Sequence, residues 1–452
     1  MPINKNKVNN IIDTIIDNQE ANWNDVFNID EDITGKLHDY QLCNLYEMLT
    51  LFEYNDVILN GSDTGTGKTY VSGALLKKKE DYKAIIICLK TAISYWKMVL
   101  DYFNVEPLFI INYDAIIEGK YLKNGKLEKC PYLDINHGIF KWNVNKKVIF
   151  IFDEAHKCKN SKTLHGKLLL STKNKGKVLL LSATISARAQ DFAIFGYMLN
   201  LYNPLNVGRK WINNLLEQDN RMLIKPLISS LTSKIYPDKG AKMSILELGD
   251  RFPKNNVIPL PIDLDNNLIE EYDNYYTMKN NDIQNIMKIR VILEKYKTEP
   301  LAKIAKDFID DGLNVVIFLN YTESIMKIAK LLGTDNILYG KTPIEKRDEL
   351  INDFQSNKIN LLICNSKIGG ESIGLHDLHG KQRVSLISNS FSGIELKQIL
   401  GRIYRVGSLT PALQYIVYFA NTLEKEIYYL AKNKISFIDN LNEQEIGYLM
   451  IN

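Results

Sequence analysis

Short runs of almost wholly apolar residues recur along this 452-residue chain, and longer segments with helical spacing separate them. A strand that is apolar along its whole length is buried on both faces, which is typical of parallel sheets covered by helices. A first set of runs comprises residues 56–59, 84–89, 108–111, 148–152 and 178–181. A second set comprises residues 315–319, 360–364, 384–387 and 413–419. The sequence therefore predicts an α/β protein with two parallel sheets.

Two sheets suggest two lobes, and the length agrees, since compact domains usually hold about 100 to 200 residues. Pro253, Pro259 and Pro261 lie between the two sets of runs and favour a hinge there. We therefore expect a first lobe over residues 35–253 and a second lobe over residues 254–452. Within the first lobe, residues 205–250 are expected to be helical.

Residues 1–34 are rich in Asn and Asp and precede the first lobe. Their apolar residues recur at helical spacing, which predicts an amphipathic helix in an N-terminal extension. These residues are Val8, Ile11, Ile12, Ile15 and Ile16.

The composition is that of a soluble globular protein, with 45% hydrophobic and 24% charged residues. No apolar stretch approaches the roughly 18 residues of a membrane span, so no membrane association is expected. The polar start favours neither secretion nor a signal peptide. Five cysteines without a Cys-x-x-Cys pair favour a reducing intracellular compartment, such as cytoplasm, nucleus or a viral replication site. A net charge of +3 neither predicts nor excludes nucleic acid.

Residues 62–69, Ser-Asp-Thr-Gly-Thr-Gly-Lys-Thr, stand between an apolar run and a segment with helical spacing, as a Walker A phosphate loop does. Gly65 and Gly67 allow the tight path that points successive amide groups at phosphate oxygens. Lys68 supplies an ammonium group for the β and γ phosphates of ATP, and Thr69 is a predicted Mg²⁺ ligand. The predicted phosphate-binding residues are Thr64, Gly65, Thr66, Gly67, Lys68 and Thr69.

Asp153 and Glu154 directly follow the apolar run 148–152. The end of a parallel strand delivers a carboxylate beside the phosphate loop, so Asp153 is a predicted Mg²⁺ ligand. Glu154 is placed to orient or deprotonate the water that attacks the γ phosphate. The pair therefore predicts hydrolysis of ATP.

Arg402 and Arg405 are three residues apart in the segment 398–405, so on a helix they share one face. An arginine that reaches the γ phosphate stabilises the charge of the transition state. Because both belong to the second lobe, we expect hydrolysis to depend on closure of the two lobes.

In this order, the motifs resemble those of superfamily 2 helicases and translocases over nearly the whole chain. The resemblance implies two RecA-like lobes, with a nucleotide cleft between them that binds ATP and Mg²⁺. Tyr40 and Gln41 resemble the motif that recognises adenine, and Ser-Ala-Thr at 182–184 resembles the motif that couples nucleotide to nucleic acid. Gly374, within residues 369–375, resembles part of a loop that contacts the nucleic-acid backbone and ATP.

Within that superfamily, three segments are most similar to Swi/Snf-type translocases on double-stranded DNA and to related viral transcription helicases. They are the DEAH box with its following residues (153–160), the tyrosine-rich residues 268–276 and residues 398–407. Three features depart from the Swi/Snf pattern. Ser-Ala-Thr replaces Thr-Gly-Thr, residues 89–91 lack the usual proline, and the chain is short for large helical insertions.

Nucleic-acid contacts are expected on the edge of both sheets opposite the nucleotide, from side chains that hold phosphates without reading sequence. The predicted residues are Lys90, Thr91, Trp96, Asn112, Tyr113, Asn320, Asn365 and Lys367. For Trp96 and Tyr113, packing in the core is the alternative to stacking on bases.

Translocation along double-stranded DNA is the leading prediction, and a strand-separating DNA or RNA helicase, including one that releases transcripts, is the rival. A small-molecule kinase would explain the phosphate loop but would leave the second-lobe arginines without a role. An inactive binding scaffold should have lost a catalytic residue. The candidates Lys68, Asp153, Glu154, Arg402 and Arg405 are all present.

Overall fold

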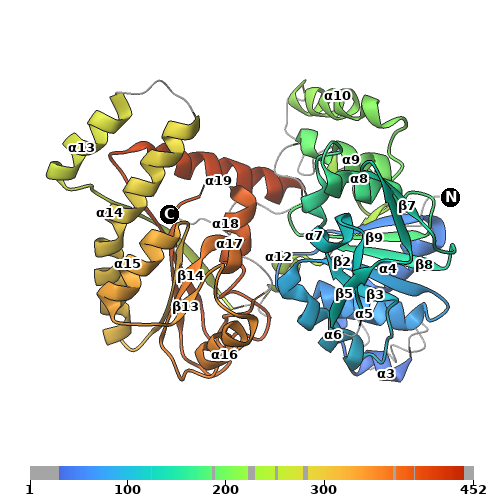
Figure 1. Ribbon diagram of the computed structural model, residues 1–452, viewed down its shortest axis with the longest axis horizontal. Helices are drawn as coiled ribbons and strands as arrows, with labels where there is room; N and C mark the ends of the chain where they lie inside the picture. Colours follow the sequence, from blue (N-terminus) through green and yellow to red (C-terminus); the bar gives the residue numbers. More distant parts are fainter. Residues whose placement is uncertain are drawn as a thin grey trace. The chain divides into compact units, whose positions relative to one another are not determined.

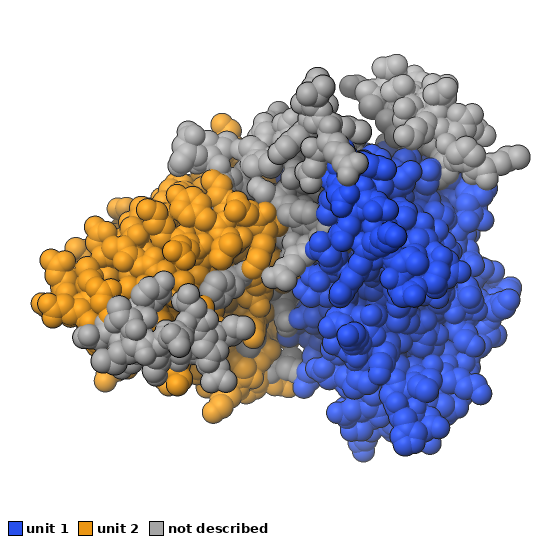
Figure 2. Space-filling model, turned by 90° about the horizontal axis from the view of Figure 1, so that it is seen from above, with its two compact units in different colours: residues 1–248, 438–444 blue, residues 249–437, 445–452 orange. Residues whose placement is uncertain are grey.

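The computed structural model describes residues 30–123, 125–185, 189–221, 230–249, 253–277, 283–369, 373–390 and 392–441. The chain forms two compact units (Figure 1). Unit 1 holds residues 1–248 and 438–444, and unit 2 holds residues 249–437 and 445–452, as coloured in Figure 2. The helix expected over residues 8–16 lies outside the described residues, and so do residues 370–372 of the expected second-lobe loop.

Unit 1 is built on a parallel sheet with the strand order β10-β1-β9-β8-β2-β3. The strands are β1 (Val57–Asn60), β2 (Lys83–Cys88), β3 (Phe109–Asn112), β8 (Val148–Asp153), β9 (Lys177–Leu181) and β10 (Gly240–Ala241). Their central residues are almost fully buried, because helices cover both faces. The parallel sheet predicted for the first lobe is confirmed. The short β10 comes from residues 205–250, which were expected to be helical throughout.

Two β-hairpins interrupt unit 1 between β3 and β8. One joins β4 (Lys120–Lys123) to β5 (Lys126–Lys129), and the other joins β6 (Leu133–Asn136) to β7 (Ile139–Trp142). The second turns through His137 and Gly138, which both have positive φ, as two-residue hairpin turns require. The sequence interpretation missed both hairpins, although Asn-Gly at 124–125 is a recognised hairpin signal.

The helices of unit 1 cover its sheet (Figure 1). Core side chains from α4, α5 and α6 pack together against the sheet, among them Phe52, Leu75 and Trp96. The α-helices are α3 (Glu31–Thr34), α4 (Asp39–Tyr54), α5 (Lys68–Lys78), α6 (Ile93–Tyr102), α7 (Tyr113–Ile117), α8 (Leu164–Ser171), α9 (Ala193–Met198), α10 (Gly208–Arg221), α11 (Thr232–Ile235) and α12 (Ile245–Leu248). The short 3₁₀ turns are η1 (Lys90–Ala92), η2 (Ala155–Cys158), η3 (Ala189–Phe192) and η4 (Leu205–Val207).

Unit 2 is built on a second parallel sheet, with the strand order β11-β16-β15-β12-β14-β13. The strands are β11 (Asn255–Ile262), β12 (Asn314–Leu319), β13 (Ile337–Leu338), β14 (Leu361–Asn365), β15 (Arg383–Ser388) and β16 (Ala412–Phe419). The helices are α13 (Asn266–Thr277), α14 (Ile283–Asp310), α15 (Thr322–Leu332), α16 (Ile344–Gln355), α17 (Ser366–Gly369), α18 (Gly393–Leu400) and α19 (Leu423–Leu441). The second predicted sheet is confirmed.

Pro259 and Pro261 do not form the expected hinge, because both lie within the strand β11. This strand stands at the edge of its sheet and pairs with β16 alone. Two prolines that are two residues apart lack their N–H groups on the same side of the strand, and an edge strand has one side without a neighbour. The prolines therefore suit an edge strand.

Candidate nucleotide and nucleic-acid sites

The phosphate loop connects β1 to α5 through two glycines in the left-handed region, with φ of 85° at Gly65 and 93° at Gly67. Side chains rarely adopt this conformation, so glycine is required for the turn. Space imposes the same requirement at Gly67, where a Cβ would lie 2.1 Å from Nε2 of Gln41. The loop is therefore shaped by backbone geometry before any ligand binds.

Gln41, at the start of α4, forms a hydrogen bond to the backbone of this loop. Its Nε2 donates to the carbonyl oxygen of Thr66 at 2.9 Å, and its Oε1 accepts from the backbone N–H of His38 at 3.0 Å. The ring of Tyr40 stacks on that of His38, with centroids 5.6 Å apart. Gln41 thus lies beside the phosphate loop, and a contact between Tyr40, Gln41 and adenine stays a prediction.

Lys68 is the first residue of α5, where the helix N-terminus favours anions. Its Nζ donates to the carbonyl oxygens of Ser62 and Asp63, at 2.8 Å each. The hydroxyl of Thr66 also donates to Asp63, at 2.8 Å. The ammonium group is thus held inside the loop that Thr64 and Thr69 flank, at the position where phosphates are predicted.

Asp153 ends β8 and is held by two aromatic side chains. Nε1 of Trp96 donates to its Oδ2 at 2.8 Å, and the hydroxyl of Tyr113 donates to its backbone oxygen at 2.8 Å. Burial raises the pKa of the Asp153 carboxyl to about 6, and the charge of Glu154 acts in the same direction. The Trp96 hydrogen bond and the Lys68 ammonium lower that pKa. Lys68 and Asp153 are therefore within electrostatic reach of each other.

Glu154 and His156 connect the DEAH box to the Ser-Ala-Thr segment. Nδ1 of the buried His156 lies 3.2 Å from Oε2 of Glu154 and 3.3 Å from the hydroxyl of Ser182. The N–H of Ser182 donates to the backbone oxygen of Asn60, at the end of β1. One chain of contacts thus joins the ends of β8, β9 and β1, the last of which leads into the phosphate loop.

Thr69 and Asp153 fit the expected role of Mg²⁺ ligands in their donor chemistry. In nucleotide sites Mg²⁺ is usually bound by one or two carboxylates together with substrate phosphates, so a cage of protein ligands is not needed. Among the described residues, no group of three or more His, Cys, Asp or Glu side chains has metal-binding geometry. At Asp153, the carboxylate accepts from the indole of Trp96 at Oδ2 and also has a hydrogen bond to the backbone of Glu154.

Arg402 and Arg405 do not share a helical face, because α18 ends at Leu400 and both lie in the turn that follows. Nε of Arg402 donates to the oxygen of Gln398 at 2.9 Å, and Nε of Arg405 donates to that of Gly401 at 3.1 Å. Both guanidinium groups also donate to the oxygen of Ile373, at 3.0 Å and 2.8 Å. The bonds to Gln398 and Gly401 satisfy carbonyls at the end of α18, and the bonds to Ile373 tie both arginines to a second segment. The two arginines therefore converge without a shared helix.

Gly374 directly follows Ile373, so the predicted loop residue lies beside this arginine pair. A Cβ on Gly374 would come within 3.4 Å of Nη1 of Arg405. Within unit 2, the segment around Gly374 and the arginine turn thus form one local structure.

The predicted nucleic-acid contacts of Trp96 and Tyr113 are wrong for this structure. Trp96 is 0% and Tyr113 is 4% exposed. A ring that is buried offers no face to a base, and the polar atoms of both rings are bonded to Asp153. The alternative from the sequence, core packing, holds for both.

Asn320 also fails as a phosphate contact. Its Nδ2 donates to Glu294 at 2.7 Å and to the backbone oxygen of Asn389 at 3.1 Å, so both N–H groups of the amide are used. Asn365 donates to the backbone oxygen of Asn320 at 3.1 Å, which leaves one of its two N–H groups. Lys367 is exposed at the same edge.

The remaining predicted contacts in unit 1 follow β2 and β3. Lys90 is exposed, and Thr91 and Asn112 are partly exposed. These strands run parallel to β8. Their loops therefore emerge at the same edge as Asp153, and not at the opposite edge as the sequence interpretation expected.

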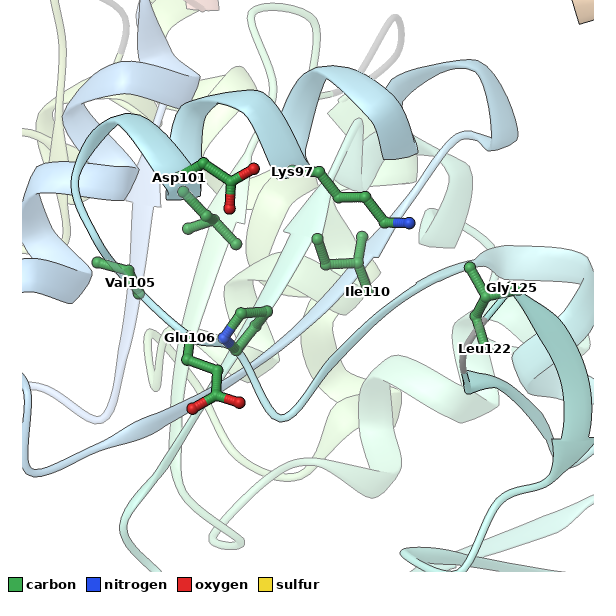
Figure 3. Close-up of a pocket in the computed structure, with 9 residues that line it drawn as sticks. Lys97, Asp101, Val105, Glu106, Ile110, Leu122 and Gly125 are labelled. Carbon is green, nitrogen blue, oxygen red and sulfur yellow. The ribbon is translucent and has the colours of Figure 1, made fainter.

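A hollow of about 430 Å³ lies beside α6, at the side of this helix that carries Lys97 and Asp101 (Figure 3). Glu106, Leu122 and Gly125 also line it. None of the predicted nucleotide or nucleic-acid residues does so, which separates this hollow from the nucleotide site.

Residues 297–407 match the family of the helicase conserved C-terminal domain. A protein of Acanthamoeba polyphaga mimivirus, named as an ATP-dependent RNA helicase, is 28% identical over 460 aligned positions, and the alignment covers 92% of this chain and 86% of that protein. The Schizosaccharomyces pombe ATP-dependent helicase fft1 is 30% identical over 132 residues, 28% of this chain. This chain spans only 14% of the length of fft1.

Two solved structures are similar to this chain over most of its length. The Sulfolobus solfataricus SWI2/SNF2 ATPase core in complex with double-stranded DNA matches 90% of this chain and 93% of its own, with 16% identity and a TM-score of 0.39. The S. cerevisiae Dbp5 bound to RNA and ADP BeF3 matches 90% of this chain and 92% of its own, with 14% identity and a TM-score of 0.49. Residues 297–407 of unit 2 thus match a helicase domain, unit 1 carries the phosphate-loop and DEAH-box motifs, and over most of its length the chain is similar to an ATP-dependent helicase.

Proposed function

We propose that this chain is a nucleic-acid-stimulated ATPase that uses the hydrolysis of ATP to translocate along double-stranded DNA. The observation that carries the proposal is the convergence of Lys68, Asp153 and Glu154 at one edge of the unit 1 sheet. A phosphate-binding ammonium, a carboxylate for a metal and a second carboxylate for water are the groups that hydrolysis of a nucleoside triphosphate requires.

In this proposal, Lys68 binds the β and γ phosphates, and Glu154 orients the attacking water. Thr69 and Asp153 hold Mg²⁺, which when bound neutralises charge on the phosphates. Arg402 and Arg405 act from the second unit on the γ phosphate, so that nucleotide binding closes the two lobes and hydrolysis reopens them.

Nucleic acid is held by Lys90, Thr91, Asn112, Asn365 and Lys367. The lysines supply ammonium groups and the asparagines amide groups, which bind phosphates without reading bases, whereas the hydroxyl of Thr91 is buried in the structure. Binding should therefore weaken steeply as salt rises. The five cysteines are all free, which agrees with a reducing intracellular compartment.

The choice of double-stranded DNA rests on the Swi/Snf-like motifs and on relatives such as the ISWI chromatin-remodelling complex ATPase of Arabidopsis thaliana, 21% identical over 221 residues. The name of the mimivirus relative favours a second candidate function, an RNA helicase. Both candidates use the same ATP site, so they differ in the nucleic acid that stimulates it.

The test compares the ATPase rate with duplex DNA, single-stranded DNA and RNA at equal salt. Duplex DNA should stimulate most, and the protein should displace a triplex-forming strand without separating the duplex. Stimulation by RNA alone, with strand separation, would replace the leading function by the second. Lys68→Ala, which should abolish ATP use, shows whether the measured rate belongs to this chain.

A further inference from the structure

Trp96 is a fully buried residue whose one polar atom is committed to the site. Its indole N–H donates to Oδ2 of Asp153 at 2.8 Å, and the side chain is 0% exposed. A hydrogen bond to a carboxylate is stronger and more directional than one between neutral groups. The bond therefore fixes the rotation of the carboxylate and keeps Oδ1 turned away from the indole.

The helix that carries Trp96 starts at a predicted nucleic-acid contact. The turn η1, with Lys90 and Thr91, runs directly into α6, and Trp96 is the fourth residue of that helix. Lys90 is exposed, whereas Oγ1 of Thr91 is buried and has no hydrogen-bond partner within the described part of the chain. At about 1.5 Å per residue, the turn and the indole are separated by about 9 Å of continuous helical backbone.

The two sides of α6 are packed differently. Val99 and Leu100 join Trp96 in the core of unit 1. The side with Lys97 and Asp101 borders the hollow of about 430 Å³ (Figure 3). A helix with such a space on one flank can shift as a rigid element without displacing packed side chains on that flank.

We propose that Trp96 is a positioning residue which couples nucleic-acid contact at Lys90 and Thr91 to the orientation of the Asp153 carboxylate. The coupling rests on the proposed function, since it requires that η1 touches nucleic acid and that Asp153 holds the metal. A phosphate bound at η1 shifts or fixes the start of α6. The indole N–H of Trp96 transmits this change in helix position to Oδ2 of Asp153. Contact with nucleic acid thereby prepares the carboxylate for metal binding.

The direct test measures the affinity for Mn²⁺ in the presence of ADP, by electron paramagnetic resonance, for Trp96→Phe. Phenylalanine keeps an aromatic ring in the core and removes the N–H donor. Partners that orient a metal ligand typically contribute about 10- to 100-fold to metal affinity, so a loss of that size is expected. An unchanged affinity would overturn the positioning role of Trp96.

Trp142 provides a matched control. Its Nε1 donates to the hydroxyl of Ser171 at 2.9 Å, and the residue is 3% exposed, so Trp142→Phe removes a comparable buried bond away from Asp153. Mn²⁺ affinity should stay at the wild-type value in this control. An equal loss in both variants would show a general effect of cutting a core tryptophan, and would also overturn the proposal.

The coupling itself is tested by a double-mutant cycle with Lys90→Ala, read as the fold stimulation of the ATPase by nucleic acid. In the wild-type background Lys90→Ala should lower the stimulation, and in the Trp96→Phe background it should lower it less. Independent effects of the two changes would overturn the coupling. A wild-type protein without nucleic-acid stimulation would overturn the proposed function and the coupling with it, whereas the Mn²⁺ measurement would still decide the positioning role.

Discussion

The carboxyl edges of the two parallel sheets are stabilised in different ways. In unit 1, the ionisable groups of the site make hydrogen bonds to several kinds of partner, and the charge of Lys68 also acts on Asp153. Lys68 donates to backbone carbonyls, Asp153 accepts from an indole, and Glu154 contacts a histidine. In unit 2, buried ions compensate one another. Nζ of Lys297 lies 2.7 Å from Oε1 of Glu424, and their side chains are 0% and 5% exposed.

The unit 2 network also fixes the loops of that edge. Glu294 is 1% exposed and accepts from the N–H groups of Asn320 and Tyr321, at 2.9 to 3.0 Å, and from the hydroxyl of Ser388 at 2.8 Å. Both carboxylate oxygens of Glu294 are thus hydrogen-bonded, and such buried bonds make a region rigid. The comparison teaches that the unit 1 edge gathers its ionisable groups around the phosphate loop and the DEAH box, whereas the buried ion pair of unit 2 serves as a scaffold.

A change of Arg405 has the largest expected effect and tests this comparison most strongly. Arg405 lies in unit 2, which we describe as the scaffold, but it has a predicted role in catalysis. Arg405→Ala should reduce turnover by about a thousandfold or more, because it removes a cation from the charged transition state. Nucleotide affinity should change little, and both are measured by steady-state ATPase rates and nucleotide titration. Arg347, which donates to the carbonyl oxygens of Tyr339 and Thr342, gives the matched control Arg347→Ala. Equal turnover in both variants would remove Arg405 as a catalytic group.

A change of Glu154 tests whether the carboxyl edge of the unit 1 sheet activates the attacking water. Glu154→Gln keeps the size of the side chain and removes its basicity, so turnover should fall by about 10²- to 10⁴-fold while ATP still binds. Single-turnover hydrolysis, measured beside equilibrium ATP binding, separates the two steps. Hydrolysis at the wild-type rate would remove Glu154 as the residue that activates water.

Lys297 tests the scaffold directly. Lys297→Met leaves the buried Glu424 without its cation, and breaking a buried ion pair in this way costs about 3–5 kcal/mol of unfolding free energy. Glu299 is on the same helix α14 as Lys297, and it pairs with Lys327 at 3.1 Å. That pair is solvent-accessible. Lys327→Met should therefore cost less than about 1 kcal/mol. Urea unfolding measures both, and equal losses would mean that the buried network does not stabilise unit 2.

Local signals made much of this molecule predictable from sequence. Most strands of both sheets are almost wholly apolar because both faces are buried, so they were located within one or two residues, whereas β10, β11 and β13 were not predicted. Hairpin β4–β5 was missed because Lys120 and Lys123 begin and end a strand that lies on the surface. Strand β11 was missed because prolines argue against a strand except at an edge, and the edge is visible only once the sheet order is known.

The residues of the candidate site also fall into a part that the sequence could predict and a part that it could not. The phosphate loop and the DEAH box are contiguous in sequence, so their residues could be named, although their roles stay predictions. Trp96 was assigned to nucleic acid because a sequence does not show which way an aromatic ring points. Lys297 and Glu424 are 127 residues apart, and no local pattern connects them. Groups that support a site through tertiary contacts are thus the part that sequence reasoning misses.

His376 gives the prediction with the smallest expected effect, and the charges of Arg405, Arg383 and Asp377 all act on it. Burial lowers the pKa of His376 to about 4, from its usual 6.5, and the charges of Arg405 and Arg383 act in the same direction. Between these two pKa values, the histidine binds a proton in the unfolded chain but not in the folded protein. The contribution of His376 is therefore fully present above pH 6.5 and is lost as pH falls toward 4, with a slope of at most about 1.4 kcal/mol per pH unit. His376→Asn should flatten this part of the urea-unfolding profile, with the exposed His137→Asn as control, and a slope identical to wild type would show that His376 already takes up its proton in the folded state.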